Sequence, residues 1–428
     1  MAVAQTDPTQ PSSGFLNTYF SINWVFSPRA DLVFLIGSVL TGWADFALYI
    51  FLLVRLPMRE VSDWMIIAWF VWVITLDTPH FFATYSRTYM DKEARRDMKP
   101  LLILSCGVFL IGPVAMILSY GLEAVNIGFW KAPWWLFLVG VSLWAYWHIT
   151  RQHYGIMRLY HRKNNEWGTI DAKIDSWVLY GCLLVPFVAL IARHPSSRGR
   201  VNLDGAVPWF PERAEGQSVF AYLGNLQWEQ HVVLGTLIIV GTLLAVFFGR
   251  QIYKVLNGQK IALPKILFLA AVLPLHLYMC YSDYLLMTGL LTFTMIITIY
   301  HDCQYIAIVW FYNKKRYGGD RKKAIERFGF AAKLSRNLWV YMGFAIMVSI
   351  PVWAFGCLIN RIPACDRGPY WGEQIMLDTT TWIAFFIILT SGFQMHHYIL
   401  DQYIWRPGKD KKLREDRGIE ETKATPAE

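Results

Sequence analysis

Long apolar segments alternate with short charged segments along almost the whole chain. A helix needs about 20 predominantly apolar residues to cross the hydrocarbon core of a bilayer. Ten segments approach this length, and each is bounded by charges, Gly, Pro or an amphipathic stretch. We therefore predict an all-α protein, a polytopic transmembrane helix bundle of about ten spans. The predicted spans are residues 31–54, 64–83, 100–121, 134–152, 175–193, 231–249, 263–281, 284–312, 338–358 and 379–401.

The composition agrees with an integral membrane protein. Apolar residues make up 55% of the chain and charged residues only 17%, with a mean hydropathy of +0.32, well away from the average of soluble domains. Aromatic residues reach 16%, and the belts that Trp and Tyr form at membrane surfaces account for most of them.

The distribution of Lys and Arg predicts the orientation, because these residues remain on the cytoplasmic side of an inserted bundle. Of the 40 Lys and Arg residues, 31 fall in alternate segments: the N-terminus, the loops after spans two, four, six and eight, and the tail. This asymmetry predicts an even number of spans and cytoplasmic termini. It also explains the net charge of +9 without a nucleic-acid partner.

The domain organisation expected from these segments is simple. Residues 1–30 form an N-terminal cytoplasmic segment, 31–403 a transmembrane helical domain with an external loop at 194–230, and 404–428 a charged cytoplasmic tail. The first 15 residues lack the basic region and apolar core of a cleavable signal, so the first span is expected to anchor the chain. The expected location is the bacterial inner membrane.

Familiar soluble-enzyme motifs and paired metal-binding cysteines are absent from the sequence. It contains no GxGxxG, Walker loop, GxSxG or HExxH. The six cysteines are scattered, with no C-x-x-C pair. Cys357 and Cys365 flank the outer end of the ninth span, so a disulfide between them is one option and two free thiols the other.

Six histidines lie toward the cytoplasmic ends of even-numbered spans, which places them in roughly one layer of the membrane. Ionisable residues within spans are costly unless they are paired, and they commonly mark functional sites. We predict that this layer holds a metal, although a single histidine at a helix end is more often an interfacial residue. The candidate ligands are His80, His148, His153, His301, His396 and His397.

Carboxylates and one amide accompany these histidines. Asp401 follows His397 by four residues, a spacing that puts both on one helical face, and Gln152 follows His148 in the same way. A metal-bound imidazole usually donates its other N–H to a carboxylate or carbonyl. The candidates for this orienting role, or for additional ligands, are Asp77, Gln152, Asp302 and Asp401.

The remaining histidines are left out of the predicted site. The segment RLYHRKNN suggests that His161 is solvent-exposed, and His194, His231 and His276 fall toward the opposite face. His148 and His153 are about 140° apart on an ideal helix. Both can join one site only if the helix is irregular there or partners enclose it.

A site rich in imidazoles suits iron, copper, nickel or zinc better than magnesium, and iron is the metal we predict. The layout, with the pair His396-His397 at the end of a span, resembles the membrane-bound histidine-box enzymes, the fatty acid desaturases and alkane hydroxylases. A looser similarity links it to polytopic bacterial carotenoid-cleaving dioxygenases. The spacing differs from the H-x-x-x-H and H-x-x-H-H motifs of the first family, since position 393 is Phe and no H-x-x-x-H occurs.

The sequence therefore predicts an integral membrane oxidoreductase of the oxygenase, hydroxylase or desaturase type. It would bind non-haem iron, one ion or two, and act on a lipid or another apolar molecule, with a redox partner at the basic cytoplasmic face. Two alternatives remain open. One is a membrane redox protein with b-type haem held by two histidines, and the other is a transporter that uses the His/Asp layer as a proton relay.

Overall fold

The computed structural model describes residues 18–194, 217–287, 290–360 and 381–405. This part of the chain is all-α, as predicted, with only two short strands. It forms two compact units. Unit 1 comprises the described residues of 1–37, 153–198 and 204–286, and unit 2 those of 38–152, 199–203 and 287–428.

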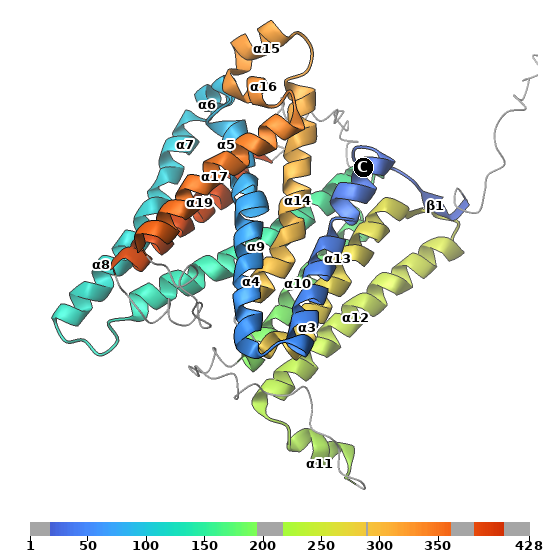
Figure 1. Ribbon diagram of the computed structural model, residues 1–428. Coiled ribbons are helices and arrows are strands. Elements are labelled where there is room, and N and C mark those ends of the chain that lie inside the picture. Colours follow the sequence, from blue (N-terminus) through green and yellow to red (C-terminus); the bar gives the residue numbers. More distant parts are fainter. Residues whose placement is uncertain (1–17, 195–216, 288–289, 361–380, 406–428) are drawn as a thin grey trace, which may run out of the picture. The chain divides into compact units, whose positions relative to one another are not determined.

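Unit 2 is built from helices of very different length (Figure 1). Helix α9 (Ala132–Lys163) contributes its residues up to Gln152 to this unit. The other elements are α3 (Val39–Arg55), α4 (Met58–Trp72), η2 (Val73–Asp77), α5 (Thr78–Thr88), α6 (Lys92–Asp97), α7 (Lys99–Ser105), η3 (Cys106–Leu110), α8 (Ile111–Ala124), α14 (Leu290–Arg316), α15 (Arg321–Phe328), α16 (Phe330–Leu334), α17 (Leu338–Asn360) and α19 (Thr381–Ile404).

Helix α5 lies at the centre of unit 2, in contact with α14, α17 and α19. Phe82 on α5 packs with Tyr305 of α14 and Tyr341 of α17 in one buried apolar cluster. Helix α19 approaches η3 closely, because a Cβ atom at Gly392 would lie only 2.5 Å from the Phe109 ring. Small residues of this kind allow membrane helices to pack at short distance. These contacts bring α5, α14 and α19 together where the predicted histidines lie.

A wide helical turn connects α4 to α5. In η2 the backbone N–H of Thr78 donates to the carbonyl of Val73, five residues earlier, which is π-helical geometry. Pro79 follows within the first turn of α5. Proline has no N–H and its ring clashes with the carbonyl four residues before it, so the widened turn removes a conflict that a regular α-helix would contain. His80 is the next residue.

Unit 1 contains three long helices, α10 (Ile170–Arg193), α12 (Trp228–Leu256) and α13 (Leu263–Tyr281), and the last part of α9. Helices α10 and α12 pack along each other. Buried Asp31 accepts hydrogen bonds from the backbone N–H of Val25 (2.7 Å) and from the hydroxyl of Tyr160 (3.0 Å). The smaller elements are β1 (Phe20–Ser21), α2 (Pro28–Ala30), η1 (Asp31–Ile36), α11 (Val219–Gly224), β2 (Ile261–Ala262) and η6 (Tyr284–Met287); β1 and β2 pair in parallel.

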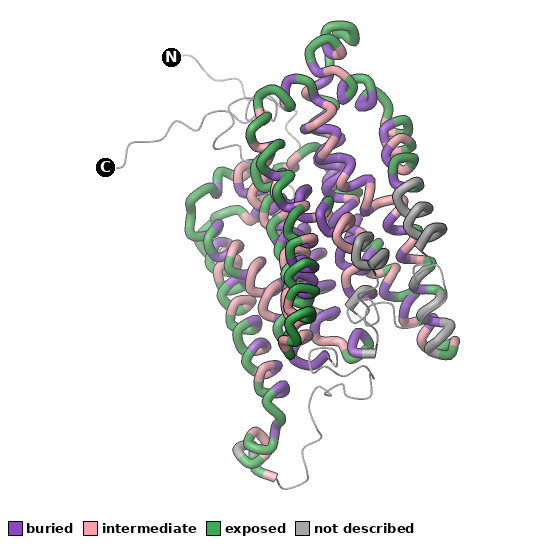
Figure 2. The backbone as a smooth tube through the Cα atoms, turned by 90° about the vertical axis from the view of Figure 1, so that its left-hand side faces the viewer, coloured by how far each residue is buried: buried purple, intermediate pink, exposed green. Residues whose placement is uncertain are grey.

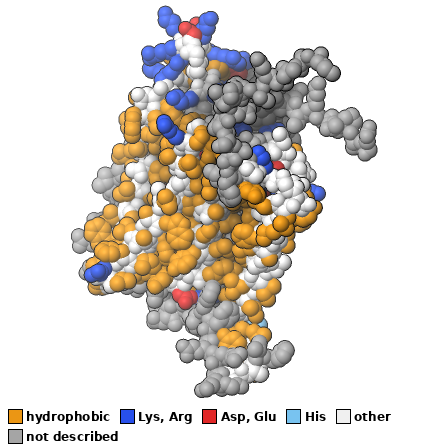
Figure 3. Space-filling model, turned by 90° about the vertical axis from the view of Figure 1, so that its right-hand side faces the viewer, with side chains coloured by type: hydrophobic (Ala, Val, Ile, Leu, Met, Phe, Trp, Pro, Cys, Tyr) orange, Lys and Arg blue, Asp and Glu red, His pale blue; other side chains and the backbone are white. Residues whose placement is uncertain are grey.

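Among the described residues, five helical segments are long and apolar enough to cross a membrane. Figure 2 shows buried and exposed positions alternating along the helices, and Figure 3 shows many hydrophobic side chains on the helix surfaces and a group of Lys and Arg side chains around α15. The structure thus supports a membrane protein. Ten spans and cytoplasmic termini stay predictions. The five segments are Pro28–Arg55, Lys99–Ala124, Ile170–Arg193, Trp228–Leu256 and Leu263–Tyr281.

Some sequence predictions concern parts of the chain outside the described residues. Cys365 lies in one such range, and the side chain of Cys357 is likewise not described, so their disulfide stays untested. Residues 1–17, 195–216 and 406–428 also lie outside the described residues. They include most of the predicted N-terminal segment, much of the external loop and most of the charged tail.

Candidate metal centre

Four of the six predicted histidines gather in unit 2, each from a different helix. His80 comes from α5, His148 from α9, His301 from α14 and His397 from α19, and all four are buried. Together with Asp302 and Asp401 we call them the histidine cluster. The distances between ring centroids are 4.3 Å for His80 and His397, 4.9 Å for His80 and His301, 4.9 Å for His148 and His397, 5.3 Å for His148 and His301, and 6.2 Å for His80 and His148.

Within this cluster, one ligand atom from each of His80, His148, His397 and Asp401 lies within 4.8 Å of the others. Asp401 Oδ2 is 3.6 Å from His397 Nε2 and 3.9 Å from His148 Nε2. These separations are too long for hydrogen bonds. They suit two atoms that each lie about 2.1 Å from a common ion, since such atoms are at most about 4.2 Å apart.

Three ring nitrogens of the histidine cluster lack hydrogen-bond partners. Nε2 of His80, His148 and His397 are all buried, and none is within hydrogen-bond geometry of another described residue. A buried polar atom without a partner costs roughly 1–3 kcal/mol, and three in one place are unusual. A metal ion would satisfy all three lone pairs at once.

Thr84 fixes which nitrogen of His397 is available. Its hydroxyl donates to Asp401 Oδ1 at 2.7 Å and lies 2.7 Å from His397 Nδ1. A hydroxyl has one hydrogen and an ionised carboxylate can only accept, so Thr84 accepts the Nδ1–H of His397. The lone pair of that imidazole is then on Nε2, the atom nearest to Asp401 Oδ2. Tyr305 donates a second hydrogen bond to Asp401 Oδ1, at 2.5 Å.

A second carboxylate lies beside His80. Asp302 Oδ1 is 3.1 Å from His80 Nδ1, and Asp302 Oδ2 accepts a 2.8 Å hydrogen bond from the indole of Trp72. Asp302 Oδ1 and His80 Nδ1 are not in hydrogen-bond geometry, but a carboxylate this close favours a proton on Nδ1 and a lone pair on Nε2. His80, Asp302 and His301 also form a second group with metal-ligand spacing.

The carboxylates around these histidines form no ion pair with a Lys or Arg of the described residues, and Arg87 acts on Asp401 only through space. Asp77, Asp302 and Asp401 are each 7% exposed or less, and no described Lys or Arg side chain forms an ion pair with them. The carboxylates of Asp77 and Asp302 are near enough to repel each other. A bound cation would offset this buried negative charge.

Two predicted ligands are not brought into the cluster. His396 is buried on another face of α19, where its Nε2 contacts the hydroxyls of Ser105 (2.9 Å) and Tyr89 (3.2 Å). His153 belongs to unit 1, where its ring lies 5.8 Å from that of His276. Because α9 is one continuous helix through both residues, His148 and His153 keep their angular separation. Gln152 instead donates to the backbone carbonyl of His301 at 2.8 Å.

Thr84, Tyr305 and Trp72 were missed by sequence reasoning, although a signal for two of them was present. Thr84 follows His80 by four residues and Tyr305 follows His301 by four, the same spacing as His397 and Asp401. Residues four apart share a helical face. A hydrogen-bonding residue one turn after each histidine was therefore a usable sequence pattern. Trp72 carries no comparable signal.

The prediction that His161 is exposed was wrong. Helix α9 continues to Lys163, and this extension buries His161 against α10, where Nε2 lies 2.8 Å from Asp175 Oδ2. The neighbouring carboxylates pair with basic side chains: Lys265 lies 2.6 Å from Asp175 and 2.5 Å from Glu166. We call this set the ion-pair network. It consists of His161, Glu166, Asp171, Asp175, Arg250, Lys254 and Lys265.

His161, Glu166 and Asp175 also have metal-ligand spacing. The ammonium groups of Lys254 and Lys265 already occupy the positions that a cation would take beside Glu166. The ion-pair network is therefore a structural element of unit 1, and the histidine cluster is the candidate metal centre.

Comparison with known protein families, with curated proteins and with solved structures finds no match to this chain.

Proposed function

We propose that the chain is an integral membrane oxidoreductase that binds iron at the histidine cluster and acts on a lipid-soluble substrate. The observation that carries this proposal is the set of three buried Nε2 atoms without hydrogen-bond partners, two of which lie within 4 Å of Asp401 Oδ2. His80, His148, His397 and Asp401 would hold the ion. His301 and Asp302 are close enough to contribute to a second one.

Iron is favoured by the donor set. Imidazoles combined with a carboxylate are typical of non-haem iron sites. The four imidazole rings approach one another so closely that a compact ion suits the cluster better than a porphyrin, which is why b-type haem is the weaker alternative. When bound, iron would supply oxygen activation or one-electron chemistry.

The residues around the cluster would orient its ligands and limit water. Thr84 and Tyr305 hold Oδ1 of Asp401, so that Oδ2 remains for the ion. The ring of Tyr398 stacks on His148, with the centroids 4.3 Å apart, and Phe81 lies 5.1 Å from His397. Aromatic rings of this kind reduce the access of water to a bound ion.

The topology belongs to the same proposal. We propose ten spans with cytoplasmic termini in a bacterial inner membrane, because 31 of the 40 Lys and Arg residues fall on one side of that arrangement. The histidine cluster would then lie near the cytoplasmic face. A redox partner would reach it from the basic side.

A proton-coupled transporter is the second candidate, favoured by one observation. Asp77 is buried close to Asp302 without being part of either metal-ligand group. Buried carboxylates next to histidines in a span can pass protons as well as hold an ion.

Metal analysis with an optical spectrum of the purified, detergent-solubilised protein tests the proposal. We expect stoichiometric iron and no intense Soret band, since non-haem iron bound by nitrogen and oxygen lacks that absorption. A strong Soret band would favour haem. Folded protein that contains no metal and takes up none when Fe(II) is added would favour the transporter.

A further inference from the structure

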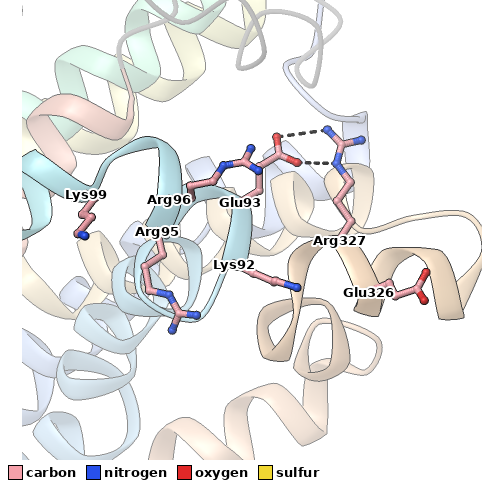
Figure 4. A pocket seen from close by; sticks show the side chains of 7 residues that line it. All are labelled: Lys92, Glu93, Arg95, Arg96, Lys99, Glu326 and Arg327. Carbon is pink, nitrogen blue, oxygen red and sulfur yellow. Dashed lines mark hydrogen bonds and ion pairs between the residues drawn. The ribbon is translucent and has the colours of Figure 1, made fainter.

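Basic side chains surround an open hollow at one end of unit 2. Helices α6 and α15 and the start of α7 enclose a volume of about 610 Å³ (Figure 4). Cationic side chains outnumber acidic ones in its lining by five to two. The lining residues are Lys92, Glu93, Arg95, Arg96, Lys99, Glu326 and Arg327.

The hollow is held in shape by buried acidic residues. Asp91 caps the N-terminus of α6 through Oδ1 and accepts hydrogen bonds from Arg316 and Tyr317 through Oδ2, both at 2.9 Å. Burial raises the pKa of the Tyr317 phenol, so this donor keeps its proton. Glu93 binds Arg327 with its two oxygens at 2.5 and 3.2 Å, as the dashed lines in Figure 4 show.

Three of the cations are left available by these contacts. Glu93 is engaged by Arg327, and Arg96 lies 3.1 Å from Asp97. Lys92, Arg95 and Lys99 are exposed and form no ion pair with a carboxylate in the described ranges. Uncompensated positive charge in a preformed hollow favours an anionic ligand.

An apolar surface begins directly beside the hollow. Lys99 is the first residue of the membrane-spanning segment Lys99–Ala124. Ile103, one helical turn further along α7, is 60% exposed, and the adjacent Leu104 is 78% exposed. Side chains four apart share a face, so the cationic lining continues into a surface suited to hydrocarbon.

We propose that this hollow is a binding site for an anionic phospholipid, with the phosphate headgroup among Lys92, Arg95 and Lys99 and the acyl chains along α7. Basic pockets at the ends of membrane helices bind such headgroups. Free phosphate would use the charges but not Ile103 and Leu104. An acidic protein would gain nothing from a site at the start of a span. The inference rests on the membrane location and is independent of the metal centre.

Native mass spectrometry of the full chain in detergent tests the proposal. The protein would be titrated with phosphatidylglycerol, with phosphatidylcholine and with inorganic phosphate. We expect retention of phosphatidylglycerol over phosphatidylcholine, and about 30-fold weaker phosphatidylglycerol binding by the double variant Arg95→Gln/Lys99→Gln, since each basic residue near an anionic surface contributes roughly 1 kcal/mol.

The matched control is Lys322→Gln/Lys323→Gln, which removes two exposed cations of α15 that do not line the hollow. It should bind phosphatidylglycerol as the unaltered chain does. The thermal unfolding midpoint, measured on all variants, shows whether each is folded.

Equal retention of the two lipids would overturn the proposal. Equal losses of phosphatidylglycerol binding in the two double variants would also overturn it. They would indicate a diffuse basic surface, of the kind that binds an acidic protein. Competition by millimolar inorganic phosphate that removes the lipid completely would point instead to a site for a soluble phosphate.

Discussion

Each carboxylate of the ion-pair network in unit 1 pairs with a Lys or Arg, whereas those of the histidine cluster in unit 2 face imidazoles. Lys265 contacts Glu166 and Asp175. Lys254 likewise contacts two acidic side chains of the network. In the cluster, Asp401 has two hydroxyl donors on one oxygen and two imidazole nitrogens beyond hydrogen-bond range of the other. Both sets are buried and both contain groups with metal-ligand spacing.

The difference shows that spacing alone does not identify a metal site. A buried carboxylate needs a counter-charge. In the network the chain supplies that charge itself, so each acid is part of the packing. In the cluster no described Lys or Arg forms an ion pair with the carboxylates, and the nearest imidazole nitrogens have lone pairs available to a cation. The two clusters should therefore respond in opposite ways to the loss of one member.

The largest effect should follow His397→Ala. This change removes a central Nε2 and should abolish bound metal, and size exclusion shows whether the variant is folded. Metal per folded protein, measured by elemental analysis after size exclusion, is the test. The control is His396→Ala, next to it and also buried, which removes hydrogen bonds with Ser105, Tyr89 and Tyr85 but none with the histidine cluster. Equal metal loss in both variants would contradict the assignment.

The reverse pattern is expected for Lys265→Met. Lys265 is 1% exposed, and without it two buried carboxylates lose their closest partner. Breaking a buried pair from one side typically costs about 3–5 kcal/mol of unfolding free energy. Denaturant unfolding in detergent measures that loss, and metal per folded protein should not change. Lys260→Met, at an exposed position, should alter stability by less than about 0.5 kcal/mol. If the two variants were equally stable, the network would not be structural.

A smaller effect should separate ligands from the residues that orient them. Thr84→Val keeps the size of the side chain but removes the hydroxyl between Asp401 and His397. Loss of such a partner typically weakens metal affinity by about 10–100-fold, which competition with a calibrated chelator can measure. Thr88→Val is the matched control, since Thr88 is buried one turn later on α5 and bonds only the carbonyl of Thr84. An unchanged affinity in Thr84→Val would show that the tautomer of His397 is set elsewhere.

The helical fold and the membrane character could be predicted from the sequence because apolar segment length is a strong and local signal. The same signal predicted one common layer for His80, His148, His301 and His397, and the structure brings these four together. The sequence could not predict that the four helices carrying these histidines are neighbours, since that depends on which helices pack against α5. His153 shows the limit: it was predicted in the same layer, but its angular position on α9 differs from that of His148, and it belongs to unit 1. His161 was placed wrongly because a basic, polar segment hides the continuation of α9 to Lys163.

The widened turn between α4 and α5 determines the direction in which the side chains of α5 point around the helix axis. Each residue turns an α-helix by about 100°, and a π-helical turn accommodates one residue more than a regular turn. Deleting a single residue between Val73 and Asp77 would let the helix run on regularly, with Pro79 again in conflict with a carbonyl. His80 would then face a different neighbour. The one extra residue in this turn therefore decides whether the His80 imidazole points toward the histidine cluster or away from it.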